Sequence, residues 1–315
     1  MVDSHGRNIE YLRLSLTERC NLRCVYCRDR DLSRPESPLS AAQMERILRA
    51  MVSLGINRVR LTGGEPLLCA DLEQIVAAAN AIPRISDLAM TTNGQLLAYR
   101  AAGLKRAGLM RINISLDSLR ADRYRDITGG GNVSQVLTGI DAALTCGLTP
   151  VKLNCVVIRG VNDNEINDFI ALAREQALTV RFIELMPLGG IRDDSRRVST
   201  EEILISHGGG LVEIPPAYSG QPAREYTGPG FRGAVGFISA MSRRFCTECN
   251  RIRVTSDGKL RPCLGDNREI DLRESLSQGE DALREAIRIG VYRKPGGHHF
   301  SGAFESPRKM NRIGG

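Results

Sequence analysis

The sequence predicts an α/β fold in which short β-strands alternate with helices over the first 190 residues. About six runs with β-type apolar patterns are separated by stretches in which apolar residues recur at helical spacing. This alternation is typical of βα units around a parallel sheet, and six units are fewer than the eight of a closed barrel. The pattern alone leaves an open partial barrel and a doubly wound sheet as alternatives.

The predicted elements follow one another in a regular order. The strands cover residues 11–17, 57–66, 85–94, 110–119, 150–160 and 179–190. The helices lie near residues 40–55, 71–81, 95–107, 133–147 and 164–177. The first helix begins at a capping serine, Ser40, and stops at Gly55. Unusual polar and glycine-rich loops follow the strands, and in both architectures the carboxyl ends of the strands carry the active site.

The alternation of strands and helices breaks after residue 190. Residues 208–236 are rich in glycine and proline, and a hairpin is predicted around the turn Asp257-Gly258. One helix at roughly 273–290 and a polar, glycine-rich tail follow. We therefore predict a first domain at residues 1–190 and a C-terminal subdomain at residues 191–315.

The composition indicates a globular protein. The chain of 315 residues is 42% hydrophobic and 25% charged, which excludes wholesale disorder. A net charge of +7 favours a phosphorylated small molecule as ligand. Nucleic acid is disfavoured because aromatic residues make up only 4% and tryptophan is absent. The start of the chain is polar and no apolar run approaches the ~18 residues of a membrane helix, so we expect a cytoplasmic protein that does not contact membranes.

Cysteine is the most informative residue type. The chain has nine cysteines, and an odd number cannot pair completely within the chain. Six of them form two tight groups, which is typical of ligands for a metal or cofactor. The first group is Cys20, Cys24 and Cys27, and the second is Cys246, Cys249 and Cys263. The other three, Cys69, Cys146 and Cys155, stand alone, and we expect them to be structural.

The first group has the spacing C-x3-C-x2-C and directly follows the first predicted strand. Three thiolates on one loop can hold a 4Fe–4S cluster and leave one iron open for a small molecule. The alternative is a zinc site completed by a distant histidine, for which His5, His207, His298 and His299 are the candidates.

The second group has the spacing C-x2-C-x13-C and again supplies three ligands. A zinc ribbon would need a fourth ligand, and no further C-x2-C pair follows Cys263. A second 4Fe–4S cluster with an open iron is the other interpretation, and such an iron can bind a nitrogen or oxygen of a substrate.

The first group, together with Gly63-Gly64-Glu65-Pro66 after the second predicted strand, resembles the signature of radical S-adenosylmethionine (SAM) enzymes. The resemblance implies that Cys20, Cys24 and Cys27 hold a 4Fe–4S cluster that binds S-adenosylmethionine through its open iron. One-electron cleavage then yields a 5′-deoxyadenosyl radical. The glycines would let backbone carbonyls approach the methionine amino group.

The second group resembles a more specific family. The segment FCTECNRIRVTSDGKLRPCL at residues 245–264 is similar to the C-terminal motif of the GTP 3′,8-cyclases of molybdenum cofactor biosynthesis. The similarity extends to RLTGGEPLL, TTNG, NISLDSL, KLNCVVIRG, FIELMPLG, KPGGHHF and the closing Gly314-Gly315. It implies an incomplete (β/α)6 TIM-like barrel with a C-terminal subdomain that carries the second 4Fe–4S cluster on Cys246, Cys249 and Cys263.

The implied activity is that of a radical SAM lyase acting on GTP. Hydrogen is abstracted from ribose C3′, and the carbon radical attacks guanine C8 to give (8S)-3′,8-cyclo-7,8-dihydroguanosine 5′-triphosphate. This is the first step of molybdopterin biosynthesis. The implied partners are an electron donor such as flavodoxin or ferredoxin and a cyclic pyranopterin monophosphate synthase that takes the product. The oligomeric state stays open, with a homodimer as one option.

The resemblance also implies individual contacts. For S-adenosylmethionine they are Tyr26, Gly64, Ser115 and Met186. For GTP they are Arg13, Arg60, Thr91, Lys152, Arg251, Ile252 and Arg253. A triphosphate favours converging Arg and Lys, and inward-facing cations are costly unless an anion meets them. The terminal Gly314 and Gly315 are implied in catalysis, because two glycines can thread a space that side chains would block.

Two rival functions belong to other classes. A radical SAM enzyme that modifies peptides and carries an auxiliary cluster would share the first cysteine group, but such enzymes usually have more than three C-terminal cysteines. A nucleotide-binding sensor stabilised by iron–sulfur or zinc would be no enzyme at all. The glycine-rich loop after the second strand and the open first cluster argue against the sensor.

Overall fold

The computed structural model describes residues 1–27, 37–188, 193–300, 306 and 308–314. In these residues twelve strands form one sheet in the order β12-β11-β10-β1-β2-β3-β4-β5-β6-β9-β8-β7. The first six strands are β1 (Tyr11–Ser15), β2 (Arg58–Thr62), β3 (Asp87–Thr92), β4 (Arg111–Ser115), β5 (Val151–Val157) and β6 (Leu178–Glu184). They pair in sequence order and in parallel, which confirms the predicted βα units.

Helices connect these strands and cover one side of the sheet. They are α1 (Ala41–Ser53), α2 (Leu72–Asn80), α3 (Leu97–Arg106), α4 (Ala121–Thr128), α5 (Val133–Thr145), α6 (Ile166–Glu175) and α7 (Thr200–His207). Ser40 caps α1 as predicted, in a capping box with Gln43. Helix α4 was missed by the sequence prediction because it is short and buries few side chains, chiefly Tyr124 and Ile127.

The C-terminal part of the chain extends the sheet at both ends. Its strands are β7 (Val212–Ile214), β8 (Arg224–Thr227), β9 (Ala234–Ile238), β10 (Arg251–Val254), β11 (Lys259–Arg261) and β12 (Ile270–Asp271). Strand β9 pairs in parallel with β6, and β10 pairs in parallel with β1. Because the edge strands β7 and β12 do not pair with each other in the described part of the chain, the sheet is open there. The division predicted at residue 190 stays a prediction.

The predicted hairpin and helix of this part can be compared with the structure directly. Strands β10 and β11 form an antiparallel hairpin around Asp257-Gly258, as predicted. The helix predicted at 273–290 is two helices, α8 (Leu272–Gln278) and α9 (Glu280–Tyr292), which Gly279 separates at φ +112°. A last helix, α10 (Met310–Ile313), lies near the end of the chain. None of the described helices is both long and apolar enough to cross a membrane.

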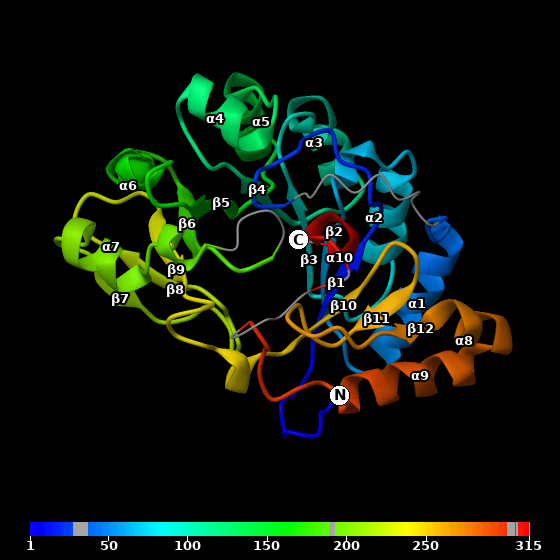
Figure 1. Ribbon diagram of the computed structural model, residues 1–315. Helices are drawn as coiled ribbons and strands as arrows, with labels where there is room; N and C mark the ends of the chain where they lie inside the picture. Colours follow the sequence, from blue (N-terminus) through cyan, green and yellow to red (C-terminus); the bar gives the residue numbers. More distant parts are fainter. Residues whose placement is uncertain (28–36, 189–192, 301–305, 307, 315) are drawn as a thin grey trace.

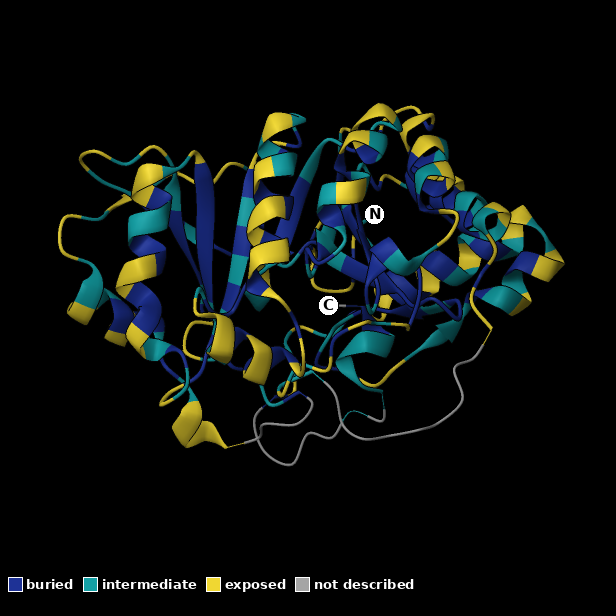
Figure 2. Cartoon of the chain, turned by 90° about the horizontal axis from the view of Figure 1, so that it is seen from above, coloured by how far each residue is buried: buried dark blue, intermediate teal, exposed yellow. Residues whose placement is uncertain are grey.

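The arrangement gives the sheet an outer and an inner side. Figure 1 shows α1 to α6 around the outer side of the curved sheet and α10 on the inner side beside β1 and β2. Figure 2 shows the buried strands between helices whose outer surfaces are exposed. Successive side chains of a strand point to opposite sides of the sheet. Leu12 of β1, Val59 of β2 and Ile252 of β10 are therefore in the hydrophobic core under the helices.

The alternate residues of the same strands point to the inner side. The register places Arg13 of β1 beside Arg60 of β2 and beside Arg253 of β10. Three arginines from three neighbouring strands therefore form a row across the inner face. This row is a product of strand register, since the three residues are far apart in the sequence.

Candidate active site

The inner side of the sheet surrounds a cavity. Its volume is about 310 Å³, within the about 300–1,000 Å³ of a usual ligand site. All six cysteines of the two predicted groups line it. None of the nine cysteines, all of which lie within the described residues, forms a disulfide. The cavity thus joins two groups that are more than 200 residues apart in the sequence.

The first cysteine group lies on the loop after β1. The main chain of this loop is held by α4, since Arg23 N donates to Thr128 O at 2.8 Å and Val25 N donates to Ile127 O at 2.9 Å. Leu22 N also donates to Cys20 Sγ at 3.4 Å. Burial, followed by the nearby carboxylate of Asp117, raises the pKa of Cys24 well above its usual range. A thiolate at this position therefore needs a bound cation, as a metal cluster would provide.

The glycine-rich loop after β2 packs directly against the first cysteine loop. Gly64 N donates to Thr17 O at 2.7 Å, and a Cβ at Gly64 would lie 2.6 Å from Glu18 O. Gly63 has φ +152°, and a Cβ there would lie 2.6 Å from Thr17 O. These glycines are required for the approach of two main chains, and Gly64 also lines the cavity.

Glu65 of the same loop fixes the neighbouring strand end. Its buried carboxylate accepts from Thr92 Oγ1 at 2.6 Å and from Asn93 N at 2.7 Å. Burial raises the pKa of Glu65 to about 7, although these hydrogen bonds oppose the shift. Asn93 in turn donates to Cys20 Sγ at 3.9 Å, a long contact that still directs a donor toward the thiolate.

The four residues predicted to contact S-adenosylmethionine all line the cavity, namely Tyr26, Gly64, Ser115 and Met186. The Tyr26 hydroxyl donates to Asp117 Oδ2 at 2.6 Å, and Val156 N donates to Asp117 Oδ1 at 2.9 Å. Burial raises the pKa of Asp117 to about 6, with the Tyr26 hydrogen bond opposing the shift. Asp117 is thus a buried carboxylate at the edge of the cavity that orients Tyr26.

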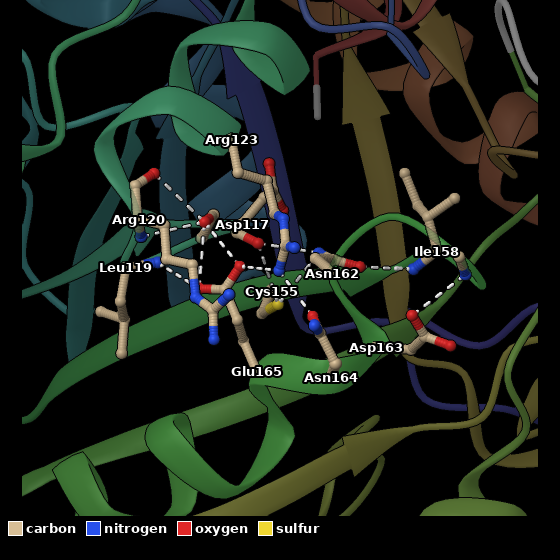
Figure 3. Close-up of polar contacts among 12 residues, drawn as sticks. Asp117, Leu119, Arg120, Arg123, Cys155, Ile158, Asn162, Asp163, Asn164 and Glu165 are labelled. Atoms are coloured by element: carbon tan, nitrogen blue, oxygen red, sulfur yellow. Dashed lines mark hydrogen bonds and ion pairs between the residues drawn. The ribbon is translucent and has the colours of Figure 1, made fainter.

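A polar network behind Asp117 holds this loop in place (Figure 3). Asn162 Nδ2 donates to Asp117 O at 2.7 Å and to Val156 O at 2.9 Å, and its Oδ1 accepts from Ile158 N at 2.8 Å. Glu165 accepts from Ser118 Oγ at 2.7 Å and from Leu119 N at 2.8 Å. These contacts join the loop after β4 to the loop after β5, so we assign the network to positioning.

The second cysteine group has different surroundings. Cys246 is the first residue of a short 3-10 helix, Cys246–Glu248, Cys249 follows this helix directly, and Cys263 follows β11. Burial opposes ionisation of Cys249, but the nearby Arg251 and Lys294 outweigh it and lower its pKa to about 6. Arg251 also donates to Cys249 Sγ at 3.5 Å.

The residues fit iron–sulfur clusters better than zinc. Among the described residues, no three His, Cys, Asp or Glu side chains converge closely enough to hold a single ion. In a 4Fe–4S cluster each cysteine binds a different iron, so its ligands lie farther apart than those of one zinc ion. Of the candidate histidines, His298 lines the cavity, but its Nε2 donates to Ala240 O at 2.9 Å.

Most of the residues predicted to contact GTP line the same cavity as the two cysteine groups. These are Arg13, Arg60, Thr91, Arg251 and Arg253. Within the described residues, the Nε atoms of Arg13 and Arg60 are buried without a hydrogen-bond partner. Burial, followed by the charge of Arg60, lowers the pKa of Arg13 to about 10. Unpaired buried guanidinium groups are costly, and an anionic ligand would compensate them.

Two of the predicted GTP contacts lie elsewhere. The Lys152 ammonium pairs with Glu225 at 2.6 Å, and Lys152 is not among the residues that line the cavity. The side chain of Ile252 is fully buried in the core on the opposite side of β10. Ile252 could therefore meet a ligand only through its main chain.

Arg181 and Lys294 also line the cavity and were missed by the sequence prediction. Arg181 lies on β6, its buried Nε has no hydrogen-bond partner in the described residues, and burial followed by the charge of Arg60 lowers its pKa to about 9. The signal was present, since Arg181 interrupts an apolar strand just as Arg60 does. Lys294 is buried and donates to Pro262 O at 2.7 Å beside Cys263.

The end of the chain enters the same cavity. Met310 and Asn311 line it, and Gly314 is buried with φ +82°. Arg253 donates to Gly314 O, and a Cβ at Gly314 would lie 2.7 Å from Thr62 Oγ1. Gly315 lies outside the described residues. The tail also buries an apolar side chain, Ile313, which the polar sequence of the tail did not suggest.

Comparison with known proteins identifies the class first. Residues 14–173 match the Radical SAM superfamily, and residues 178–300 match Molybdenum Cofactor Synthesis C. The fold is similar to that of Streptococcus suis SuiB bound to S-adenosylmethionine, with a TM-score of 0.61 and 13% identity over 92% of this chain and 66% of that chain. It is also similar to tagged anSMEcpe with bound AdoMet, with a TM-score of 0.57 and 14% identity over 93% of this chain and 79% of that chain. The fold and the cavity are those of a radical SAM enzyme with an open (β/α) barrel.

Three relatives narrow this class to one family. GTP 3′,8-cyclases from Clostridium acetobutylicum, Moorella thermoacetica and Pelotomaculum thermopropionicum are 44%, 46% and 45% identical to this chain, each over the full length of both proteins. The chain belongs to the GTP 3′,8-cyclase family. Its cofactors are therefore S-adenosylmethionine and two 4Fe–4S clusters, and a peptide-modifying radical SAM enzyme is not favoured.

Proposed function

We propose that this chain converts GTP into (8S)-3′,8-cyclo-7,8-dihydroguanosine 5′-triphosphate, the first step of molybdenum cofactor biosynthesis. The observation that carries the proposal is one cavity lined by both cysteine triplets and by arginines whose buried Nε atoms have no hydrogen-bond partner in the described residues. A ligand that spans this cavity needs a polyanionic part for the arginines and a group that can bind an open iron. A purine nucleoside triphosphate has both.

Cys20, Cys24 and Cys27 would hold the first cluster and Cys246, Cys249 and Cys263 the second; when bound, the clusters and S-adenosylmethionine would supply a 5′-deoxyadenosyl radical and an open iron for the substrate. The chain must then hold ribose C3′ next to the radical and exclude water and other hydrogen donors. We assign Tyr26, Gly64, Ser115 and Met186 to the S-adenosylmethionine side, with Asp117 orienting Tyr26.

The arginine row is assigned to the triphosphate. Arg13, Arg60 and Arg253 are neighbours in register, and Arg181 approaches the same place from β6. In the amide orientation that satisfies its surroundings, Asn113 Oδ1 accepts from Arg181 at 3.1 Å and from Arg60 at 3.2 Å, so it links the two guanidinium groups. Charge-assisted bonds from several guanidinium forks would fix the phosphates and leave the ribose near the first cysteine group.

The reaction also needs electrons and an outlet for its product. We propose a flavodoxin or ferredoxin as the donor, because the loop of the first cysteine group is exposed at Arg19, Arg23 and Val25. Such carriers are commonly acidic, and opposite charge speeds encounter. The product would pass to a cyclic pyranopterin monophosphate synthase.

The donor site can be tested by charge reversal. Arg23→Glu should lower the rate several-fold with flavodoxin as reductant and leave the dithionite-driven rate unchanged. Arg288→Glu, on the exposed face of α9, is the matched control. Equal rates for Arg23→Glu and wild type across a range of flavodoxin concentrations would place the donor elsewhere.

Product analysis tests the activity itself. Anaerobic protein with both clusters is incubated with GTP, S-adenosylmethionine and dithionite, and the products are separated by liquid chromatography with mass detection. We expect 5′-deoxyadenosine and the cyclised triphosphate in equal amounts, and no cyclised product without GTP. Wild-type protein that cleaves S-adenosylmethionine but leaves GTP intact would contradict the proposal.

A further inference from the structure

Two arginines of the tail that carries Gly314 form ion pairs with the rest of the molecule. The first, Arg308, pairs with Asp257 in the turn of the β10–β11 hairpin and with Glu269 just before β12. Arg308 lies 2.8 Å from Asp257 Oδ2 and 2.8 Å from Glu269 Oε1. Asp257 is only 1% exposed and Arg308 is 15% exposed, so this contact is largely removed from solvent.

The second ion pair joins the tail to the loop of the first cysteine group. Arg312 Nε lies 3.3 Å from Glu18 Oε2, and Glu18 is 7% exposed. Asn311 Nδ2 also donates to Glu18 O at 3.2 Å. Glu18 lies two residues before Cys20, and its carbonyl oxygen is one of the atoms that a Cβ at Gly64 would meet. The tail therefore docks where the cysteine loop and the glycine-rich loop meet.

Helix α10 follows Arg308 and contains Arg312, and it cannot hold itself in place. It has four residues, and isolated helices of this length are unstable in water. Its only fully buried apolar side chain in the described residues is Ile313. The placement of Gly314 against Ser15 and Thr62 therefore depends on anchors before the helix and within it.

We propose that Arg308 and Arg312 are positioning residues that hold Gly314 in the cavity. Neither arginine lines the cavity, so each acts through the tail and not on substrate. Arg308 holds the tail at the β10–β11 hairpin, which precedes Cys263 of the second group. Arg312 holds it at the loop of the first group. The glycine end is thereby placed relative to both cluster sites at once. This inference rests on the proposed function only for its effect on turnover.

The test uses the full chain with both clusters loaded. Arg308→Ala and Arg312→Ala are compared with Arg288→Ala, which removes an exposed arginine paired with Glu285 on α9. Hydrogen exchange of the amides of residues 309–314 reports the position of the tail without any turnover. We expect at least tenfold faster exchange there in both tail variants and no change in Arg288→Ala.

The second readout is the ratio of cyclised product to 5′-deoxyadenosine. It should fall at least tenfold in both tail variants, and an added peptide with the sequence of residues 306–315 should restore part of it. If Arg308→Ala loses its clusters, Arg312→Gln, at a more exposed site, carries the test. Unchanged exchange in the tail would overturn the proposal. Faster exchange with an unchanged ratio of cyclised product to 5′-deoxyadenosine would support the anchoring role of the two arginines. It would also show that the position of the tail does not affect the reaction.

Discussion

The two cysteine groups supply the same number of thiols but lie in opposite electrostatic surroundings. Cys24 is half-buried, and burial together with the nearby carboxylate of Asp117 raises its pKa. Cys249 is also half-buried, but Arg251 and Lys294 lie beside it and lower its pKa to about 6. Cys24 and Cys249 each belong to a C-x2-C pair, so the difference in pKa comes from the strands and loops around them.

This difference in charge shows how one cavity can hold two ligands, each at its own position. A site with an acidic neighbour favours a cation, and a site with basic neighbours favours an anion. S-adenosylmethionine carries a positive sulfonium, whereas GTP carries a triphosphate. The polarity of the cavity therefore agrees with S-adenosylmethionine at the first group and GTP between the arginines and the second group.

The strongest test of this comparison removes one cluster at a time. Cys24→Ser should lose only the first cluster and Cys249→Ser only the second, because each cluster depends on its own three thiolates. Iron analysis of anaerobic protein should fall from about eight to about four per chain in each variant. Both should lose cyclisation by more than about 1,000-fold, with Cys24→Ser also losing 5′-deoxyadenosine formation. Stoichiometric zinc at the second group would contradict this assignment.

The next test concerns the tail that reaches between the two groups. Gly314→Ala, or deletion of Gly314-Gly315, should lower cyclisation by more than about 100-fold, because a Cβ would meet Thr62 Oγ1 at 2.7 Å and φ is +82°. Both clusters and the unfolding midpoint should be unchanged, and some 5′-deoxyadenosine should still form. Full product formation by the truncated enzyme would show that the tail has no part in the reaction.

A smaller effect is expected at the arginine row. Arg60→Ala or Arg181→Ala should weaken GTP binding by about 1.5–3 kcal/mol, the scale of a hydrogen bond to a charged group, and leave S-adenosylmethionine binding unchanged. Isothermal titration of loaded, unreduced enzyme measures both ligands. The wild type should also bind guanosine more weakly than GTP. Equal affinities for guanosine and GTP would show that the arginine row does not bind the triphosphate.

The smallest effect lies in the thiols themselves. In metal-free protein Cys249 should be mostly thiolate above pH about 6 and lose its charge as the pH falls through that value, since its pKa is lowered. Cys24, with a raised pKa, should stay protonated at pH 7. Iodoacetamide at pH 7 should therefore alkylate Cys249 at least about tenfold faster than Cys24, because only the thiolate is the nucleophile. Peptide mapping by mass spectrometry gives both rates, and Arg251→Ala should slow the Cys249 reaction.

Several site residues and the βα units of this protein could be predicted from local sequence. Cysteines spaced three and four residues apart must share a loop, so Cys20 and Cys249 could be identified from the sequence. Gly64 could be identified in the same way, because a pair of glycines after a strand indicates a close approach of two main chains. The βα alternation likewise predicted the six parallel strands, because period and capping are local properties.

Other features depended on the folded chain. Nothing local shows that β9 and β10 extend the parallel sheet, that Lys152 pairs with Glu225, or that Arg181 faces the same cavity as Arg60. Each of these follows from strand register between segments far apart in the chain, and a shift of one residue would send every side chain to the opposite face. The order of amino acids was enough to show which chemical groups are present and which cofactors they can hold. Which of the cations meet in one cavity was set by the folded sheet, because that choice rests on long-range pairing.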